Sequence, residues 1–286
     1  MDARISRPLV AAAGGVALLA AVLVAAYYVG PLARWDATAV AGLRALSDDH
    51  RSIWLISHAI ALTANIEPVL LTLGVLCVAG VAWGRQRQVA GAVALVAAAG
   101  IATWLLKIAA AHPRYQPVLS PDQLDPIAFP SGHATAAMSL SLAAVIVVPG
   151  RWRRLAGILG AGYALTVAIA LMVAGWHFPS DVLGGFLIAG SLGMVVLAAL
   201  RAAEGGGERV DPVQQEGQFA FGSFGVRPLE LLVTAIALGV GALALTRADE
   251  LASYAASHTT AVLAAVAVAA GAAGVVYGVA AELETR

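Results

Sequence analysis

Long apolar runs separated by short polar stretches are the dominant pattern of this sequence. A helix needs about 20 apolar residues to cross a hydrocarbon layer roughly 30 Å thick. Runs that meet or approach this length span residues 9–29, 68–83, 89–111, 133–148, 155–176, 182–200, 229–245 and 259–281. The pattern therefore predicts an all-α, polytopic membrane helix bundle with eight spans.

Two further stretches are predicted to lie at the membrane surface. Residues 53–66 are apolar but are interrupted by His58 and Asn65, which favours a helix lying in the interface plane. Residues 31–51 mix charged positions, such as Asp36, with apolar ones. They are predicted to form an amphipathic connection with a solvated polar face.

The composition agrees with a membrane protein. The chain is 60% hydrophobic and 12% charged, whereas an ordinary soluble domain is about 25% charged. The first run is longer than the roughly 7 to 15 apolar residues of a signal peptide, so it is predicted to be a retained anchor. Cys77 is the only cysteine and lies in a predicted span, so no intrachain disulfide is expected. Neither a metal, a redox cofactor nor nucleic-acid binding is indicated.

The arginines and lysines are unevenly distributed between the two predicted sides. With eight alternating spans, eleven lie on the side of the termini and six on the other. Positive residues favour the cytoplasmic side, so both termini are predicted to be cytoplasmic. The Ala-, Val- and Gly-rich spans favour a bacterial plasma membrane.

The chain divides after the sixth predicted span. Residues 1–201 are predicted to form a six-helix domain, 202–227 a cytoplasmic linker rich in Gly, Glu and Gln, and 228–286 a C-terminal two-helix extension. Gly274 and Gly278 are four residues apart, a spacing that permits close helix approach. A homodimer contact is one interpretation, but intrachain packing is favoured because such pairs arise by chance in a chain rich in Gly and Ala.

Three polar blocks interrupt the apolar pattern on the predicted outer side. The first contains Lys107 and Arg114, seven residues apart. A phosphomonoester carries about −1.5 to −2 charge near neutral pH, so these two cations would nearly balance it. A guanidinium can also hold two phosphate oxygens at once. For a single Lys or Arg at a helix end, interfacial snorkelling would be preferred, but the blocks that follow favour a phosphate site.

The other two blocks carry histidines at helix starts. In the second, Ser131 is a suitable N-cap, and Gly132 would let an anion approach the unpaired amides of the helix start beside His133. In the third, His177 and Asp181 are one helical turn apart. A carboxylate on one imidazole nitrogen leaves the other as a nucleophile; the alternative is a structural His–Asp cap.

The three blocks together resemble the type-2 phosphatidic acid phosphatase superfamily. Its signature reads Lys, six residues, Arg-Pro; then Pro-Ser-Gly-His; then Ser-Arg, five residues, His, three residues, Asp. The sequence departs from it by Tyr115 in place of the first proline, and by Ala170 and Leu171 in place of Ser-Arg. The resemblance covers residues 9–200, implies a six-helix lipid phosphatase core, and stops before the predicted C-terminal transmembrane hairpin.

The resemblance also implies the role of each residue. His177 would attack phosphorus to form a phosphohistidine, with Asp181 orienting its ring. His133 would protonate the leaving oxygen and then activate water. The phosphoryl oxygens would be held by Lys107, Arg114, Ser131 and Gly132. No metal or other cofactor is implied.

Leu171 removes a charge-assisted contact worth about 1.5 to 3 kcal/mol. Three explanations stay open: His112 substitutes as a cation, the substrate carries a different headgroup or less charge, or the protein is a weak or inactive relative that binds lipid phosphates. The remaining histidines are predicted to be surface residues: His50, His58 and His258.

The expected function is hydrolysis of a phosphorylated lipid of the outer leaflet. The substrate would be an isoprenyl phosphate or pyrophosphate, phosphatidic acid, phosphatidylglycerol phosphate or a prenyl-phospho-sugar. The partners would be this lipid phosphate and the bilayer. The alternatives are a lipid-to-lipid phosphotransferase, which would use the same residues, and a non-enzymatic lipid-phosphate carrier.

Overall fold

The computed structural model describes residues 3–48, 50–114, 116–120, 123–205 and 248–284. Within these ranges the chain is helical and contains no strand. The helices are α1 (Ala3–Tyr28), α2 (Gly30–Asp48), α3 (Arg51–Leu62), α4 (Ile66–Ala82), α5 (Gln86–Ala109), the 3-10 turn η1 (Pro117–Leu119), α6 (Gly132–Val147), α7 (Gly150–Val173), α8 (Pro179–Gly205), α10 (Ala248–Ser257) and α11 (Thr259–Glu284).

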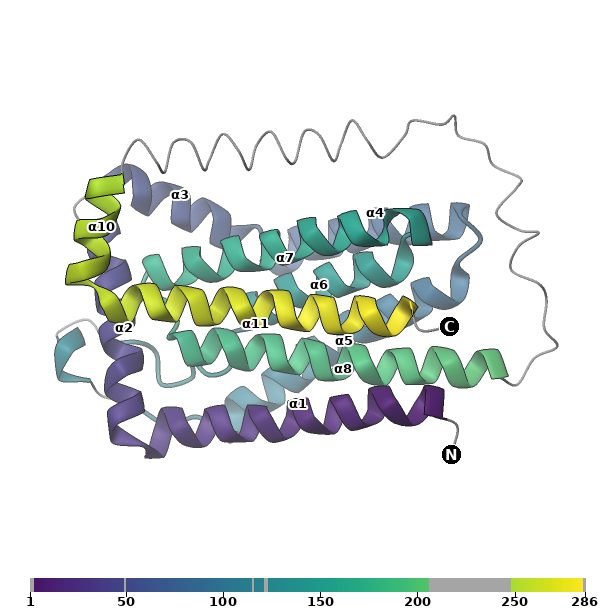
Figure 1. Ribbon diagram of the computed structural model, residues 1–286, viewed down its shortest axis with the longest axis horizontal. Coiled ribbons are helices and arrows are strands. Elements are labelled where there is room, and N and C mark those ends of the chain that lie inside the picture. The colour runs from purple at the N-terminus through teal and green to yellow at the C-terminus, as the bar shows by residue number, and fades with distance from the viewer. Residues whose placement is uncertain (1–2, 49, 115, 121–122, 206–247, 285–286) are drawn as a thin grey trace.

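The long helices run side by side, and α2 crosses one end of the bundle (Figure 1). The start of α1 and the end of α11 lie at the opposite end. There Arg201 at the end of α8 donates to the Arg4 carbonyl at 2.6 Å and pairs with Glu282 at 3.0 Å. Also at this end, Arg85 donates to the Ile146 carbonyl at 3.2 Å. Arg4 of α1, Arg85 of the α4–α5 connection and Arg201 of α8 therefore lie at the end of the bundle where α1 begins and α11 ends.

The protein is a multi-pass membrane protein, but eight spans are not confirmed. In the described part, five helices are long and apolar enough to cross a membrane: α1, α5, α7, α8 and α11. A sixth span exists if α3 and α4, which meet at a bend of 52°, count as one. The predicted run at 133–148 forms α6, which has only 16 residues and is enclosed by other helices. The predicted run at 229–245 lies outside the described residues.

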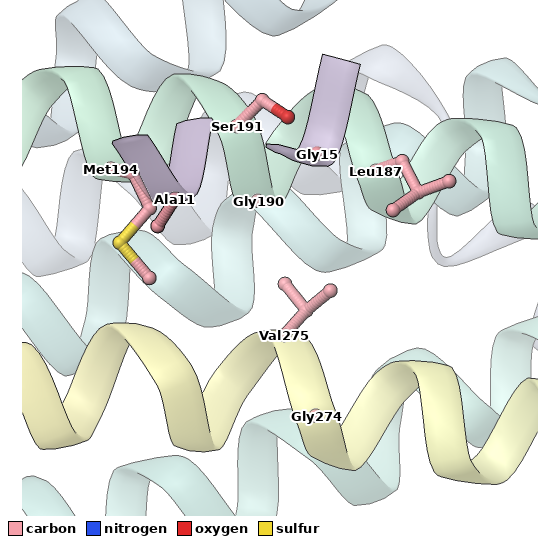
Figure 2. A pocket seen from close by; sticks show the side chains of 8 residues that line it. All are labelled: Ala11, Gly15, Leu187, Gly190, Ser191, Met194, Gly274 and Val275. Atoms are coloured by element: carbon pink, nitrogen blue, oxygen red, sulfur yellow. The ribbon is translucent and has the colours of Figure 1, made fainter. Parts of the chain in front are cut away.

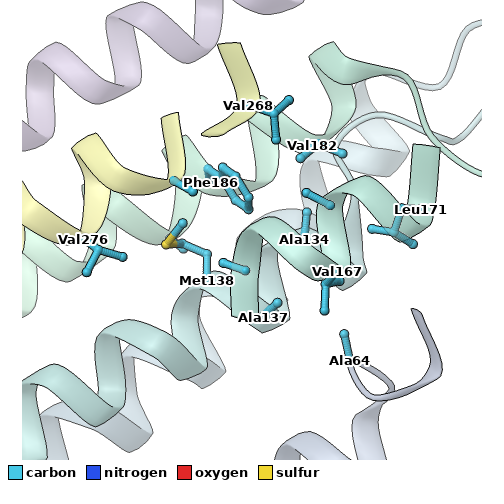
Figure 3. Packing of buried hydrophobic residues seen from close by; sticks show 14 of the residues in the cluster. Ala64, Ala134, Ala137, Met138, Val167, Leu171, Val182, Phe186, Val268 and Val276 are labelled. Atoms are coloured by element: carbon cyan, nitrogen blue, oxygen red, sulfur yellow. The ribbon is translucent and has the colours of Figure 1, made fainter. Parts of the chain in front are cut away.

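The core lies where α6, α7, α8 and α11 meet (Figure 3). Met138 of α6, Val167 of α7, Phe186 of α8 and Val276 of α11 belong to one buried cluster. Helix α11 therefore shares one core with α6, α7 and α8. A Cβ added to Gly278 of α11 would lie 3.4 Å from Cε of Met194, so Gly278 packs against α8, whereas no atom lies within 4 Å of a Cβ added to Gly274. The homodimer stays a prediction.

Two segment predictions need correction. Residues 31–51 were expected to be a solvated connection, yet α2 has a buried face that includes Asp36, Val40 and Ser47. This face is buried because α2 lies across the ends of other helices and its acid is paired there. The helix α8 also continues to Gly205, past the predicted start of the linker; the rest of that linker lies outside the described residues.

The contact between α8 and the start of α6 depends on Gly185. A Cβ atom there would lie 2.8 Å from both the Ser131 carbonyl oxygen and Oγ1 of Thr135. Because one obstacle is backbone, Gly185→Ala should push the helices apart and cost about 1 to 3 kcal/mol of stability. Gly162→Ala is the matched control, since no atom lies within 4 Å of its added Cβ.

Thermal unfolding in detergent should show a lower Tm for Gly185→Ala than for the wild type. The Gly162→Ala protein should match or exceed the wild type, because alanine favours a helix interior by up to about 1 kcal/mol. Equal Tm values for the two variants would contradict close packing at Gly185.

Candidate functional site

A cavity of about 280 Å³ opens at the end of the bundle opposite Arg201. Four segments meet around it: the break between α3 and α4, the end of α5, the start of α6 and the connection between α7 and α8. Its lining consists of Ala64, Asn65, Ile66, Lys107, Gly132, His133 and His177. The cavity therefore brings together one residue or more from each of the three predicted polar blocks.

His177 lies in the connection from α7 to α8. Gly175 turns the chain there with φ at +71°, a conformation that favours glycine. Nδ1 of His177 is 3.4 Å from Oδ2 of Asp181 and forms no aligned hydrogen bond there. The same oxygen accepts from the Phe178 N–H at 2.9 Å, which caps the start of α8. The predicted pair is thus brought together, and the capping role considered as its alternative is present too.

His133 lies in the first turn of α6 and faces the same cavity. Its ring centroid is 6.4 Å from that of His177 and 5.7 Å from that of Trp176. Nε2 of His133 is 2.9 Å from Oδ1 of Asn65. Because an amide oxygen only accepts, this contact places a proton on Nε2. Sequence reasoning missed Asn65, although a polar residue that breaks an apolar run before a proline was a usable signal.

The start of α6 and Lys107 form the positive side of the cavity. Cε of Lys107 lies 3.9 Å from the place where a Cβ on Gly132 would be. Nζ of Lys107 donates to the Ile127 carbonyl at 2.6 Å, which holds the ammonium group at the level of the helix start. A helix N-terminus next to an ammonium group attracts anions. Lys107 and Gly132 are therefore both placed where the sequence predicts phosphate-binding residues.

Ser131 has a different environment from Gly132. The predicted N-cap is confirmed, because its Oγ accepts from the Ala134 N–H at 3.2 Å. The Ser131 N–H donates to the Asp181 carbonyl at 2.9 Å, and the residue is fully buried. The Ser131 amide, which was predicted to hold phosphate, is thus engaged within the protein, as is the hydroxyl.

Arg114 lies behind the cavity, between two carboxylates. Its guanidinium pairs with Asp181 and with Asp36, whose Oδ2 is 3.3 Å away. It also donates to Oγ of Ser180 at 3.0 Å. The guanidinium is 4.1 Å from the centroid of the Phe178 ring, an arrangement that favours cation–π attraction. Arg114 therefore binds Asp181, the carboxylate beside His177, and does not line the cavity.

Asp36 is the other residue that sequence reasoning missed. It is 4% exposed and accepts from the N–H of Ser180 at 3.0 Å and from its hydroxyl at 2.5 Å. The pKa of Asp36 is raised to about 7, because burial first and then the charge of Asp181 raise it by more than Arg114 and the bonds from Ser180 lower it. The signal was the helical spacing of Asp36, Val40 and Ser47, which share the buried face of α2.

Leu171, which stands where the family motif has an arginine, is enclosed by the protein core. Leu171 is 0% exposed and belongs to the main core cluster (Figure 3). His112 was considered as a substitute for the missing arginine. Its Nδ1 is 2.8 Å from the Pro113 carbonyl oxygen, and it does not line the cavity. Another cation is nearer to the His177 connection, because Cδ of Arg44 lies 3.0 Å from the place of a Cβ on Gly175.

The other three histidines lie in different surroundings. His50 is exposed before α3, as predicted. His58 was predicted to be a surface residue, but it is half-buried and its ring is 3.9 Å from that of Trp54 and 5.0 Å from that of Trp176. It is covered because α3 folds back over the end of α7. His258 is also half-buried and stacks on Tyr254 at 4.4 Å.

A second, smaller hollow of about 110 Å³ lies between α1, α8 and α11 (Figure 2). Glycines and apolar side chains form most of its wall, with the Ser191 hydroxyl close to Gly15. Among the described residues, no ionisable side chain lines it. The lining of the larger cavity, by contrast, includes two histidines and a lysine, so chemistry is assigned there.

Comparison with known protein families agrees with this location. The sequence model of the PAP2 superfamily matches residues 88–204, which extend from the first turn of α5 to the end of α8. This segment contains all three polar blocks. No curated protein and no solved structure matches the chain significantly. The match to the PAP2 superfamily supports a lipid phosphatase in general terms.

Proposed function

We propose that this chain, which residues 88–204 place in the PAP2 superfamily, is a metal-independent lipid phosphatase that works through a phosphohistidine. The observation that carries the proposal is the pair of histidines in one cavity. The ring centroids of His133 and His177 are 6.4 Å apart, beside Lys107 and the start of α6. A nucleophile, a proton donor and an anion site are thus available to one phosphoryl group.

The first chemical step would transfer the phosphoryl group to His177. Nδ1 of His177 faces Asp181, so Nε2 is the nitrogen left to attack phosphorus. As the P–N bond forms, the bond from phosphorus to the lipid oxygen breaks. His133, in its imidazolium form, gives the proton on Nε2 to that oxygen and is left as a neutral imidazole. In the second step His133 takes a proton from water, and the hydroxide attacks phosphorus and releases His177.

The anion site would stabilise the charge that spreads over the phosphoryl oxygens. Lys107 supplies a full positive charge, and the start of α6 adds the partial charge of its amides. Because Arg114 is paired with two acids, Lys107 is the only permanent cation in the cavity lining. This favours a monophosphate, of about −1.5 to −2 charge, over a pyrophosphate. It agrees with the explanation of Leu171 that invokes a less charged substrate.

The site is proposed to face the outside of the cell. The cavity lies at one end of the bundle, and Arg4, Arg85 and Arg201 lie at the other end, where α1 begins and α11 ends. Positive residues gather on the cytoplasmic side of membrane proteins. The substrate is therefore proposed to be a phosphorylated lipid of the outer leaflet, with the outer leaflet of a bacterial plasma membrane as its source.

Phosphate release by the purified protein tests this function. Wild-type protein in detergent would be incubated with isoprenyl phosphate, isoprenyl pyrophosphate, phosphatidic acid and phosphatidylglycerol phosphate. Release should be fastest from a monophosphate and fall to background in His177→Ala. The matched control is His258→Ala, because that ring stacks on Tyr254 away from the cavity. Equally slow release by the wild type and His177→Ala would instead favour a lipid-phosphate binding protein.

A further inference from the structure

Helix α2 holds both ends of the connection that carries His177. At one end, Oγ of Ser47 donates to the Val173 carbonyl in the last turn of α7 at 2.9 Å. At the other end, Asp36 accepts from the N–H and the hydroxyl of Ser180 in the first turn of α8. Figure 1 shows α2 crossing the bundle at this end. One helix therefore fixes the chain before and after the nucleophile.

Asp36 also reaches His177 through side chains. Its Oδ2 pairs with Arg114, which pairs with Asp181, whose other oxygen faces Nδ1 of His177. The side chains of Asp36, Arg114 and Asp181 are 6%, 7% and 0% exposed. Water therefore screens these charges weakly, and a change at Asp36 is transmitted to Asp181.

We propose that Asp36 is a positioning residue for the nucleophile, acting through the start of α8 and through Arg114. This inference rests on the proposed function and goes beyond it, because Asp36 lies outside the segment matched by the family and outside all three polar blocks. Asp36 touches neither the cavity nor the substrate. Its removal should lower kcat and leave KM unchanged.

The charge of Asp36 should also give the reaction a pH dependence. The groups that face it are Arg114 from the connection after α5, and Ser180 and Asp181 from α8. When Asp36 is ionised, it shares the charge of Arg114, so Asp181 is less neutralised and attracts the His177 imidazole more strongly. When Asp36 is protonated, Arg114 serves Asp181 alone. Since the pKa of Asp36 is about 7, kcat should rise with pH around neutrality.

The test compares Asp36→Asn with the wild type in kcat and KM between pH 5 and pH 9. Asparagine keeps the shape and cannot ionise, so the rise of kcat near pH 7 should disappear. At alkaline pH kcat should be about ten- to a hundredfold lower, as for a reacting group displaced by a fraction of an ångström to an ångström. Asp48→Asn is the matched control, because Asp48 is an exposed acid on the same helix.

Ser180→Ala provides a second variant that introduces no change of charge. The hydroxyl of Ser180 lowers the pKa of Asp36, so its removal should move the rise of kcat to higher pH. If Asp36→Asn does not fold, the pH profile of Ser180→Ala tests the role of Asp36 instead. The inference is overturned if the wild type is active and neither variant changes the pH profile. No phosphate release by the wild type from any lipid would instead overturn the proposed function.

Discussion

Protein with His133→Ala should accumulate a phosphorylated His177, whereas His177→Ala should neither retain phosphate nor release it. The two rings lie on either side of one cavity and have different partners, Asn65 for His133 and Asp181 for His177. In the proposed mechanism, attack on phosphorus needs His177, but removal of the phosphoryl group needs His133 to activate water. The expected loss of turnover is about 10²- to 10⁴-fold for His133→Ala and complete for His177→Ala.

The measurement is covalent labelling with a ³²P-labelled aryl phosphate in detergent. An aryl leaving oxygen needs little protonation, so labelling can proceed without His133. The label should be stable in alkali, labile in acid and confined to a peptide containing His177. Label retained by His177→Ala would exclude the assigned nucleophile. If a lipid alcohol added to the wild type captures the phosphoryl group faster than water does, the protein is a phosphotransferase.

The part of the site that sequence reasoning predicted is the part that depends on local spacing. His177 and Asp181 are one turn apart, and Ser131 caps the helix that begins at Gly132, so short-range rules placed each of these groups. The cavity then brings Lys107, His133 and His177 together. The supporting residues were not predicted, because Arg114 meets Asp36 across 78 positions of sequence. No local spacing rule predicts such a pair.

Hydropathy also predicted the class of fold better than the number of spans. It counts apolar residues, but it does not distinguish a helix in lipid from one surrounded by protein. Helix α6 has an apolar sequence because other helices enclose it, so it can remain shorter than a membrane span. The opposite error occurred at α2, where charged residues suggested a solvated face. Asp36 is buried there because Arg114 and Ser180 satisfy its carboxylate.

Arg114 occupies a motif position predicted to bind phosphate, but its guanidinium contacts two carboxylates instead. A guanidinium can bridge two carboxylates in the same way that it bridges two phosphate oxygens. Here the two oxygens come from Asp36 and Asp181, and the Phe178 ring covers the guanidinium. Phosphate would therefore have to displace at least one buried acid to reach this cation. Phosphate can reach Lys107 without displacing a buried acid, because Lys107 already lines the cavity.

Loss of Arg114 should consequently destabilise the folded protein more than loss of any surface arginine. Arg114→Ala leaves Asp36 and Asp181 buried without their shared cation, a change that costs about 3 to 5 kcal/mol when one partner of a buried ion pair is removed. Arg114→Lys should be intermediate, since an ammonium group cannot donate to two carboxylates in the fork geometry of a guanidinium. The control is Arg87→Ala, because Arg87 is exposed near the start of α5.

Thermal unfolding in detergent gives the order expected for Tm: wild type and Arg87→Ala highest, then Arg114→Lys, then Arg114→Ala. Adding Asp36→Asn to Arg114→Ala should restore part of the lost Tm, because one of the two unpaired charges is removed. This recovery is a coupling that independent residues would not show. The opposite result, a Tm unchanged in Arg114→Ala with a large rise in KM for lipid phosphate, would identify Arg114 as a phosphate ligand, as its place in the motif predicts.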